Sequence, residues 1–360
     1  MNSESSSQKS ARSLIVLFFL MVALPVGLLT PLTQANAEYV LNEMTSTRSG
    51  VAYSVQVLED YAFVTGNEGV SVFDVSDARK PRLITLLELA DGAFDFCLDG
   101  WVAYIAADEE GLVIADFGDP AQPEILGALN IGGVAFDVSV DGHLAYVADN
   151  SNGLRIVDVS DPGAPVEVGS YSLSDLRAVE VRDRVAYLAV PNQGLMVLDV
   201  SEPSSPSGAR LVPGTYATIN LHLSGEALYL SCHNRGTKIL DVSDPLDPEI
   251  VGEHTIDGGE SYSAYDHGEL LFVADLQKGA RLLDISDPSD PQQLASYGTQ
   301  PHDVFHDGEY TYLACERGLV ILQYGPPDTE RSSKTSNYIA PLVVAAVAGA
   351  AIVISHLRSR

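Results

Sequence analysis

The segment DVSDP, residues 158–162, carries two carboxylates at a spacing that could bind a metal ion. Asp158 and Asp161 together could supply oxygen ligands to a hard cation such as calcium. The same arrangement recurs with its first Asp at positions Asp74, Asp116, Asp199, Asp241 and Asp284. Asp and Ser side chains also accept backbone hydrogen bonds in tight turns, and Pro presets the turn dihedral. Because a functional site would not need six copies, we interpret this segment as the corner of a repeating unit.

His302 and His306, in the segment HDVFH, have the i, i+4 spacing that binds zinc on one face of a helix. The surrounding residues, however, predict a β-strand, in which this spacing separates the two side chains by roughly 13 Å. We therefore do not expect one zinc ion to use both. The sequence contains no nucleophile elbow, phosphate loop, HExxH motif or EF-hand loop, and it indicates no catalytic set.

The corner segments belong to a repeat whose steps are 42, 42, 41, 42 and 43 residues. A seventh copy from Leu319 has Gln323 where the first Asp would stand, and the strand pair upstream of the corner recurs seven times. Each unit contains four short β-type runs and no 3.6-residue apolar pattern. The repeat predicts an all-β, seven-bladed β-propeller of four-stranded blades, each about 42 residues long. A parallel β-helix is the alternative, but its coils are shorter and need no hairpin in every unit.

The third unit shows how we assign the strands. We predict them at residues 135–140, 144–148, 154–159 and 166–171. The seventh unit ends near residue 325 without a fourth strand, whereas EYVLNEMTS, from Glu38, is a strand without a partner. We predict that this segment pairs on the outside of the last blade and closes the ring, because closure removes two open sheet edges.

Aligned units place one residue of each first strand around the central channel. We call this set the inner ring, and it consists of Ser54, Asp95, Asp137, Ala178, Asn220, Ser263 and Asp303. Six of the seven are polar, although the flanking columns are mixed or apolar. The ring should lie near the channel mouth, on the face of the turns that carry Asp149, Cys232 and Asp275. Its oxygen atoms suit calcium, a small polar ligand or ordered water, and a merely solvated channel is the simpler alternative.

The column that precedes the inner ring has an aromatic and basic character. Arg177 and His302 stand there in line with Tyr53, Phe94, Phe136 and Tyr262. Such a set could bind a sugar or a peptide. The alternative is that these side chains pack between blades. As ligand-binding residues we predict the six polar members of the inner ring together with Arg177 and His302.

The repeated pentapeptides resemble those of the LVIVD-repeat family. They read LRIVD at residues 154–158, then LVIAD, LMVLD, TKILD and ARLLD in other units, and the resemblance spans roughly residues 50–325. The seventh copy departs from the pattern at its Asp. The resemblance implies an extracellular or surface-attached bacterial or archaeal propeller whose molecular activity is mostly undefined.

The two ends of the chain predict export and anchoring. Residues 1–37 combine basic residues, an apolar run and a small-residue end, as in a signal peptide, with an uncleaved anchor as the alternative. The propeller at 38–325 is followed by a polar linker at 326–337 and an apolar stretch at 338–357, which has the length of a transmembrane helix. Arginines in residues 358–360 fit the cytoplasmic side. The alternative for this tail is a sorting signal that a transpeptidase removes.

The charge balance excludes one class of partner. The chain has 49 acidic and 20 basic residues, a net charge of −29, so that nucleic acid binding is not expected. Cys97, Cys232 and Cys315 form no recognisable framework, and we expect small buried side chains, with pairing of Cys232 and Cys315 as the alternative.

From these observations we predict a membrane-tethered propeller outside the cell that acts as a binding module for a protein or a glycan at the cell surface. No cofactor is expected apart from calcium at the inner ring. The alternative is an extracellular hydrolase or lyase that uses a metal-supported site at the channel mouth. We favour the binding module because the sequence shows no catalytic set.

Overall fold

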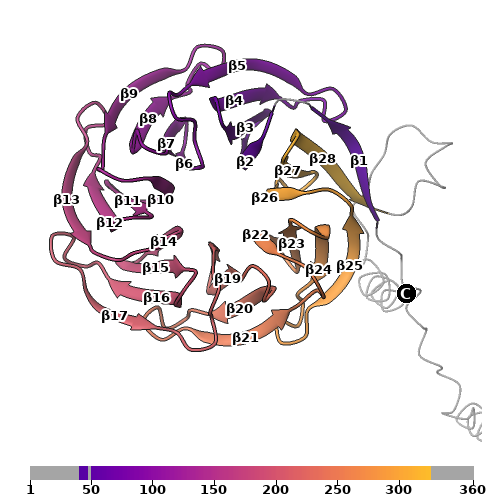
Figure 1. Ribbon diagram of the computed structural model, residues 1–360. Helices are drawn as coiled ribbons and strands as arrows, with labels where there is room; N and C mark the ends of the chain where they lie inside the picture. The colour runs from indigo at the N-terminus through magenta and orange to yellow at the C-terminus, as the bar shows by residue number, and fades with distance from the viewer. Residues whose placement is uncertain (1–39, 48–49, 326–360) are drawn as a thin grey trace, which may run out of the picture.

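The computed structural model describes residues 40–47 and 50–325. These residues form seven four-stranded antiparallel sheets arranged around a central axis (Figure 1). The predicted all-β, seven-bladed propeller is therefore confirmed. The predicted signal peptide, polar linker, transmembrane helix and basic end lie outside the described residues. Within the described part of the chain, no helix has the length and hydropathy that crossing a bilayer requires.

Each blade runs outward from the axis. The innermost strands are β2 (Ala52–Leu58), β6 (Asp95–Asp99), β10 (Ala135–Asp141), β14 (Ala178–Arg182), β18 (Asn220–Ser224), β22 (Ser261–His267) and β26 (Pro301–His306). The second strands are β3 (Tyr61–Gly66), β7 (Val102–Ala106), β11 (Leu144–Asp149), β15 (Val185–Val190), β19 (Ala227–Ser231), β23 (Leu270–Asp275) and β27 (Thr311–Cys315). The third strands are β4 (Gly69–Asp74), β8 (Leu112–Asp116), β12 (Gly153–Asp158), β16 (Gly194–Asp199), β20 (Thr237–Asp241), β24 (Gly279–Asp284) and β28 (Gly318–Gly325). The outermost strands are β5 (Arg82–Glu88), β9 (Glu124–Leu129), β13 (Val166–Tyr171), β17 (Ser207–Leu211), β21 (Glu249–His254), β25 (Gln292–Tyr297) and β1 (Val40–Ser46).

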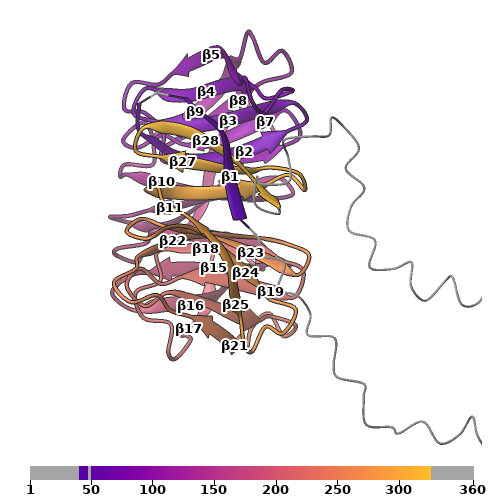
Figure 2. The same cartoon turned by 90° about the vertical axis from the view of Figure 1, so that its right-hand side faces the viewer.

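The strand β1 closes the ring, as predicted. It pairs antiparallel with β28, from Val40 opposite Gly325 to Ser46 opposite Val320. Both views show it at the circumference, between β5 and β25 (Figures 1 and 2). Because the N-terminal segment supplies the outer strand of blade 7, the chain makes no turn from a third to a fourth strand there. This explains why Gln323 can replace the corner Asp.

The corner aspartates have the structural role that the sequence indicated. Asp158 Oδ1 accepts the backbone N–H of Ser160 at 2.9 Å, and Asp161 Oδ1 accepts that of Gly163 at 3.1 Å. The first of these bonds recurs in each of the other five corners. The hydrogen bonds from Ser160 lower the pKa of Asp158. The repeated Asp therefore builds a turn.

The corners also join neighbouring blades. A Cβ atom at Gly169, on β13, would lie 1.8 Å from the carbonyl oxygen of Pro203 in the corner of the next blade. Gly252 on β21 stands in the same relation to Pro288, also at 1.8 Å. Glycine is thus required where the outer strand of one blade meets the corner of the next.

The hydrophobic core lies between the faces of adjacent blades. Between blades 4 and 5, for example, Tyr187 and Leu195 pack with Leu228 and Leu230, all buried.

Strands of the third unit end within one residue of the predicted limits. All three cysteines are free, so the pairing of Cys232 with Cys315 is not formed, and the two are buried while Cys97 is half-buried.

Candidate functional site

The six polar residues of the inner ring line one cavity on the propeller axis, with a volume of about 300 Å³. This is at the small end of the range for ligand sites in proteins. The strand register confirms the alignment, because Asp95, Asp137 and Asp303 each pair with an alanine at one position of the second strand: Ala106, Ala148 and Ala314. The structure therefore brings together the residues that the repeat placed in one column.

Asp303 connects three blades at the axis. Its Oδ2 atom accepts hydrogen bonds from the Ser54 hydroxyl and the Val55 backbone N–H of blade 1, both at 2.9 Å. Its Oδ1 atom accepts the hydroxyl of Ser263 in blade 6 at 2.5 Å. Burial raises the pKa of Asp303, and the hydroxyl and backbone donors oppose this shift.

Asp137 makes a similar connection between blades 3 and 4. Its Oδ2 atom accepts the Val179 backbone N–H at 2.8 Å, and its Oδ1 atom accepts that of Val138 at 2.6 Å. Burial raises the pKa of Asp137 to about 6 in spite of these donors. Asp95 accepts the backbone N–H of Phe96 at 2.7 Å. Its pKa is raised well above the ordinary value by burial and by the negative charges of Asp137 and Asp303.

A second ring, which was not among the residues predicted from the sequence, lines the same cavity two residues further along each first strand. It consists of Gln56, Cys97, Ser139, Glu180, His222, Tyr265 and Phe305. Alternate residues of a strand point to the same side, so reading the column at i+2 would have found it. Burial raises the pKa of Glu180 to about 8, with a further contribution from the charge of Asp137.

His222 and Asp266 form an acid–base pair at the second ring. The Nε2 atom of His222 lies 2.8 Å from Asp266 Oδ1, and the Ser224 hydroxyl donates to Asp266 Oδ2 at 3.0 Å. Burial alone would raise the pKa of Asp266, but the hydrogen bonds from His222 and Ser224 outweigh it and lower that pKa. The His222 ring also packs on Tyr265, at 4.6 Å between centroids.

The column before the inner ring forms what we call the aromatic rim, made of Tyr53, Phe94, Phe136, Arg177, Ile219, Tyr262 and His302, all half-buried. Phe136 stacks on Phe94 at 4.6 Å, and Phe94 contacts Tyr53 at 5.4 Å. The chain of rings continues from Tyr53 to His302 at 5.8 Å and from His302 to Tyr262 at 6.0 Å. At its other end the Arg177 guanidinium lies 4.6 Å from the Phe136 centroid.

Arg177 and His302 differ in position from the six polar ring residues. Neither is among the residues that line the cavity. His302 Nδ1 lies 2.9 Å from the carbonyl oxygen of Ala52 in blade 1, and Arg177 lies over Phe136 in blade 3. Both therefore contact a neighbouring blade within the rim, as the packing alternative anticipated.

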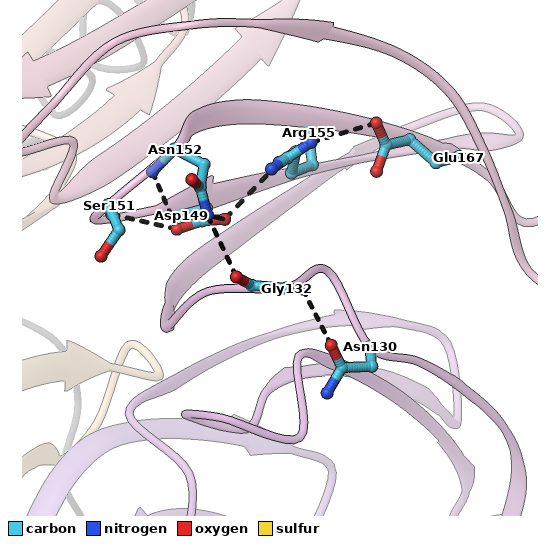
Figure 3. Close-up of polar contacts among 7 residues, drawn as sticks. All are labelled: Asn130, Gly132, Asp149, Ser151, Asn152, Arg155 and Glu167. Carbon is cyan, nitrogen blue, oxygen red and sulfur yellow. Dashed lines mark hydrogen bonds and ion pairs between the residues drawn. The ribbon is translucent and has the colours of Figure 1, made fainter.

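Asp149, which the sequence placed on the face of the channel mouth, has a carboxylate that is held within a turn (Figure 3). Its side chain is fully buried and accepts the backbone N–H groups of Ser151 and Asn152 at 3.0 and 3.1 Å. Arg155 Nε lies 3.5 Å from its Oδ2 atom. Asp275 accepts two backbone N–H groups in the same way in blade 6. These carboxylates are occupied in turns and do not face the cavity.

No cluster of metal ligands was found in the described residues. Within residues 40–47 and 50–325, no group of three or more His, Cys, Asp or Glu side chains is placed to hold a metal ion. The two histidines of the HDVFH segment have different neighbours. His306 is buried and stacks on Phe272 at 4.3 Å, whereas His302 lies in the aromatic rim.

The sheets and their axial cavity define a β-propeller, and comparison with solved structures agrees. The chain is similar to the Cps50 (Swd1) β-propeller domain of Myceliophteria thermophila, with a TM-score of 0.64, 12% identity, and coverage of 79% of this chain and 99% of that one. It is also similar to the computationally designed Ika8 protein, with a TM-score of 0.59, 7% identity, and coverage of 79% and 100%. At these identities the likeness concerns the fold alone.

The model of the LVIVD repeat matches six segments that together exceed half of the chain: residues 49–86, 93–130, 132–172, 175–210, 217–255 and 266–299. The chain belongs to the LVIVD repeat family. The matched segments end before the seventh unit, which lacks the corner Asp. No curated protein matches the chain.

Proposed function

We propose that this chain is an exported, membrane-tethered β-propeller that binds a protein or a glycan at the cell surface through its aromatic rim. The observation that carries this proposal is a polar axial cavity of about 300 Å³, whose inner-ring residues each follow a residue of the aromatic rim in the sequence. Aromatic side chains supply contact area, and convergent polar groups supply orientation. The β-propeller fold is often a protein-interaction module, and the sequence patterns at residues 1–37 and 338–357 support export and anchoring.

The test of binding compares two faces of the same propeller. We would capture envelope proteins and glycans with the full chain and with a Phe94→Ser, Phe136→Ser variant, which removes two stacked rings of the rim. Leu246→Ser is the matched control, because this leucine is 49% exposed in a corner, and the corners lie at the opposite end of the strands. We expect the rim variant to lose the partner and the control to keep it. Equal capture by both variants would place the interface elsewhere.

The test of location uses protease added to intact cells that produce the full chain. We expect the propeller to be cleaved from outside and to fractionate with membranes, whereas a chain that ends at residue 337 should enter the medium. Release of the uncut full chain without detergent would contradict a retained anchor.

A hydrolase or lyase remains the second candidate function, and one observation favours it. The His222–Asp266 pair shares the channel with Glu180, whose pKa of about 8 suits proton transfer near neutral pH. A screen with p-nitrophenyl acetate and with an acidic polysaccharide tests this idea. Activity that falls at least about 100-fold in both Glu180→Gln and His222→Asn would support it. Activity unchanged in both variants, or absent from the wild type, would remove it.

A further inference from the structure

The aromatic rim already holds one cation of this chain. The Arg177 guanidinium lies 4.6 Å from the centroid of Phe136, whose other neighbour in the rim is Phe94. Blade 4, which contributes Arg177, is the one blade whose inner-ring residue is apolar, Ala178. A positive group over an aromatic face is attracted by the ring quadrupole. The rim thus has the chemistry that cation recognition needs, and its rings continue around the mouth beyond the one that Arg177 occupies.

The carboxyl groups stand one residue further along the same first strands. Each inner-ring residue follows its rim residue in the sequence, which corresponds to about 3.3 Å along a strand. Asp95, Asp137 and Asp303 come from blades 2, 3 and 7 and all line the cavity. A group that enters from the rim end of the strands therefore passes the ring side chains before it reaches the carboxyl groups. The charge complementarity selects a cation with an apolar stem.

The carboxyl groups lie close enough to one another to interact. Burial raises the pKa of Asp95, and the negative charges of Asp137 and Asp303 raise it further. An ammonium group has three donors that rotate about a flexible stem, whereas a guanidinium matches one carboxylate with a planar pair of donors. Carboxyls on three separate blades fit the first arrangement.

We propose that the axial channel binds the ammonium group of a lysine side chain on a protein partner, with the aromatic rim around the lysine stem and Asp95, Asp137 and Asp303 around its nitrogen. This inference rests on the proposed binding function and assigns its ligand class. The four methylene groups of lysine bury readily along apolar surface while the charged end remains solvated or paired. In the proposed complex, the aromatic rim contacts the methylene groups and the inner-ring carboxyls pair with the ammonium group.

The acidic groups should release protons when the ammonium enters. A nearby positive charge favours the ionised form of a carboxyl group. The charged and titratable groups around the site are Asp95, Asp137, Asp303, Glu180, Cys97, Tyr265, His222 with Asp266, and, at the rim, Arg177 and His302. Because burial raises the pKa of Glu180 to about 8 and that of Asp137 to about 6, affinity for the ammonium should increase from pH 5.5 to 8.5.

The experiment is calorimetric titration of the full chain with Nα-acetyl-lysine methylamide. The corresponding derivatives of norleucine and arginine test the charge and its shape, and glucosamine tests an amino sugar. We expect the lysine probe to bind at least about tenfold more tightly than the other three, with heats that depend on the ionisation enthalpy of the buffer. No saturable heat with the lysine probe, or equal or tighter binding of any other probe, would overturn the proposal.

Variants locate the site. Asp95→Asn should weaken the lysine probe at least about fivefold, and this change is structurally mild because the amide keeps an oxygen that can accept the backbone N–H of Phe96. Phe94→Leu should weaken it by a similar factor through loss of ring contact. Glu88→Gln removes one negative charge from an exposed position on the outermost strand and should change affinity less than about twofold. Equal effects of Asp95→Asn and Glu88→Gln would mean that general charge attraction alone is measured, which overturns the proposal.

The outcomes separate this inference from the proposed function. If the lysine probe binds as expected while the rim variants keep their envelope partner, the interaction face is wrong and the channel chemistry stands. If the lysine probe fails while the rim variants lose the partner, the face is right and the ligand class is wrong.

Discussion

Asp303 in the last blade accepts a hydrogen bond from the backbone N–H of Val55 in the first blade, at 2.9 Å. This contact joins, at the axis, the same two blades that the N-terminal strand β1 joins at the circumference. The ring is therefore closed twice, once by a carboxylate and once by a strand. The relation of Asp137 to Val179 repeats the inner contact between blades 3 and 4.

Removal of the outer closure should destabilise the propeller strongly. Deleting residues 38–46 removes β1, so that β28 loses the strand it pairs with and the core loses the buried side chain of Leu41. We expect the melting temperature to fall by at least about 10 °C. The Ser46→Ala change, at an exposed position of the same strand, should leave it within about 2 °C. An unchanged melting temperature after the deletion would refute closure by this strand.

Removal of the inner closure should have a smaller but measurable cost. Asp303→Ala leaves the Val55 N–H and the hydroxyls of Ser54 and Ser263 without their acceptor. We expect the free energy of unfolding, measured with denaturant, to decrease by about 1–3 kcal/mol. Asp95→Ala is the comparison, since it loses the bonds to the adjacent backbone and to the Ser54 side chain but relieves repulsion from two carboxyls. A larger loss for Asp95→Ala than for Asp303→Ala would contradict the assigned roles.

Stability should depend on pH through Glu180. Its pKa is raised by burial from 4.5 to about 8, so between these values the native chain keeps a proton that the unfolded chain has released. The unfolded state then binds fewer protons, and the free energy of unfolding falls as pH rises through this window and levels off above it. Asp137, with its pKa raised to about 6, adds to the slope below that pH.

Glu180→Gln removes this titration and provides the measurement. We expect its melting temperature to fall less than that of the wild type between pH 5 and 8, and to exceed the wild type at pH 8.5 by at least about 3 °C. Glu88→Gln, at an exposed position, should keep the wild-type slope. Parallel curves for the wild type and Glu180→Gln would show that this carboxyl titrates normally.

The contact between outer strands and corners predicts a sensitive glycine. Gly169→Ala would place a Cβ atom 1.8 Å from the Pro203 carbonyl oxygen, so the two blades must separate locally. We expect a loss of about 1–3 kcal/mol in the free energy of unfolding. Gly298→Ala is the matched control, because no atom lies within 4 Å of its added Cβ and its φ is not positive. The control should be neutral or slightly stabilising, and a similar loss in both variants would refute the packing argument.

Calcium binding at the inner ring stays a prediction that calorimetry can decide. If the ring binds calcium, titration of calcium into the full chain gives a saturable heat, and no saturable heat would refute the calcium site. A saturable heat that is lost in Asp95→Ala with Asp137→Ala would instead establish the ring as a calcium site. The double variant is the control for binding elsewhere on the acidic surface.

The repeat predicted the fold because each unit must bury the same faces in the same way. The steps between Asp74 and Asp284 determined the number of units, and the partnerless segment after Glu38 indicated the closing strand. The alignment of Asp95, Asp137 and Asp303 in one column was also readable, since equivalent strand positions meet at the axis. The column two residues further, with Glu180 and His222, follows from the same periodicity, but its residue types are mixed and do not mark it as a ring.

The roles of these residues around the axis depend on contacts between blades. The blades, their order and the inner-ring positions were readable from the sequence, because local strand pattern and repeat length specify each sheet. The sequence could not show that Asp303 bonds Val55 across the closure, that the rim rings contact one another in series, or that Asp149 is buried in a turn. These relations join residues of different blades or depend on enclosure, and burial raises the pKa of a carboxyl only after all the blades have closed around it.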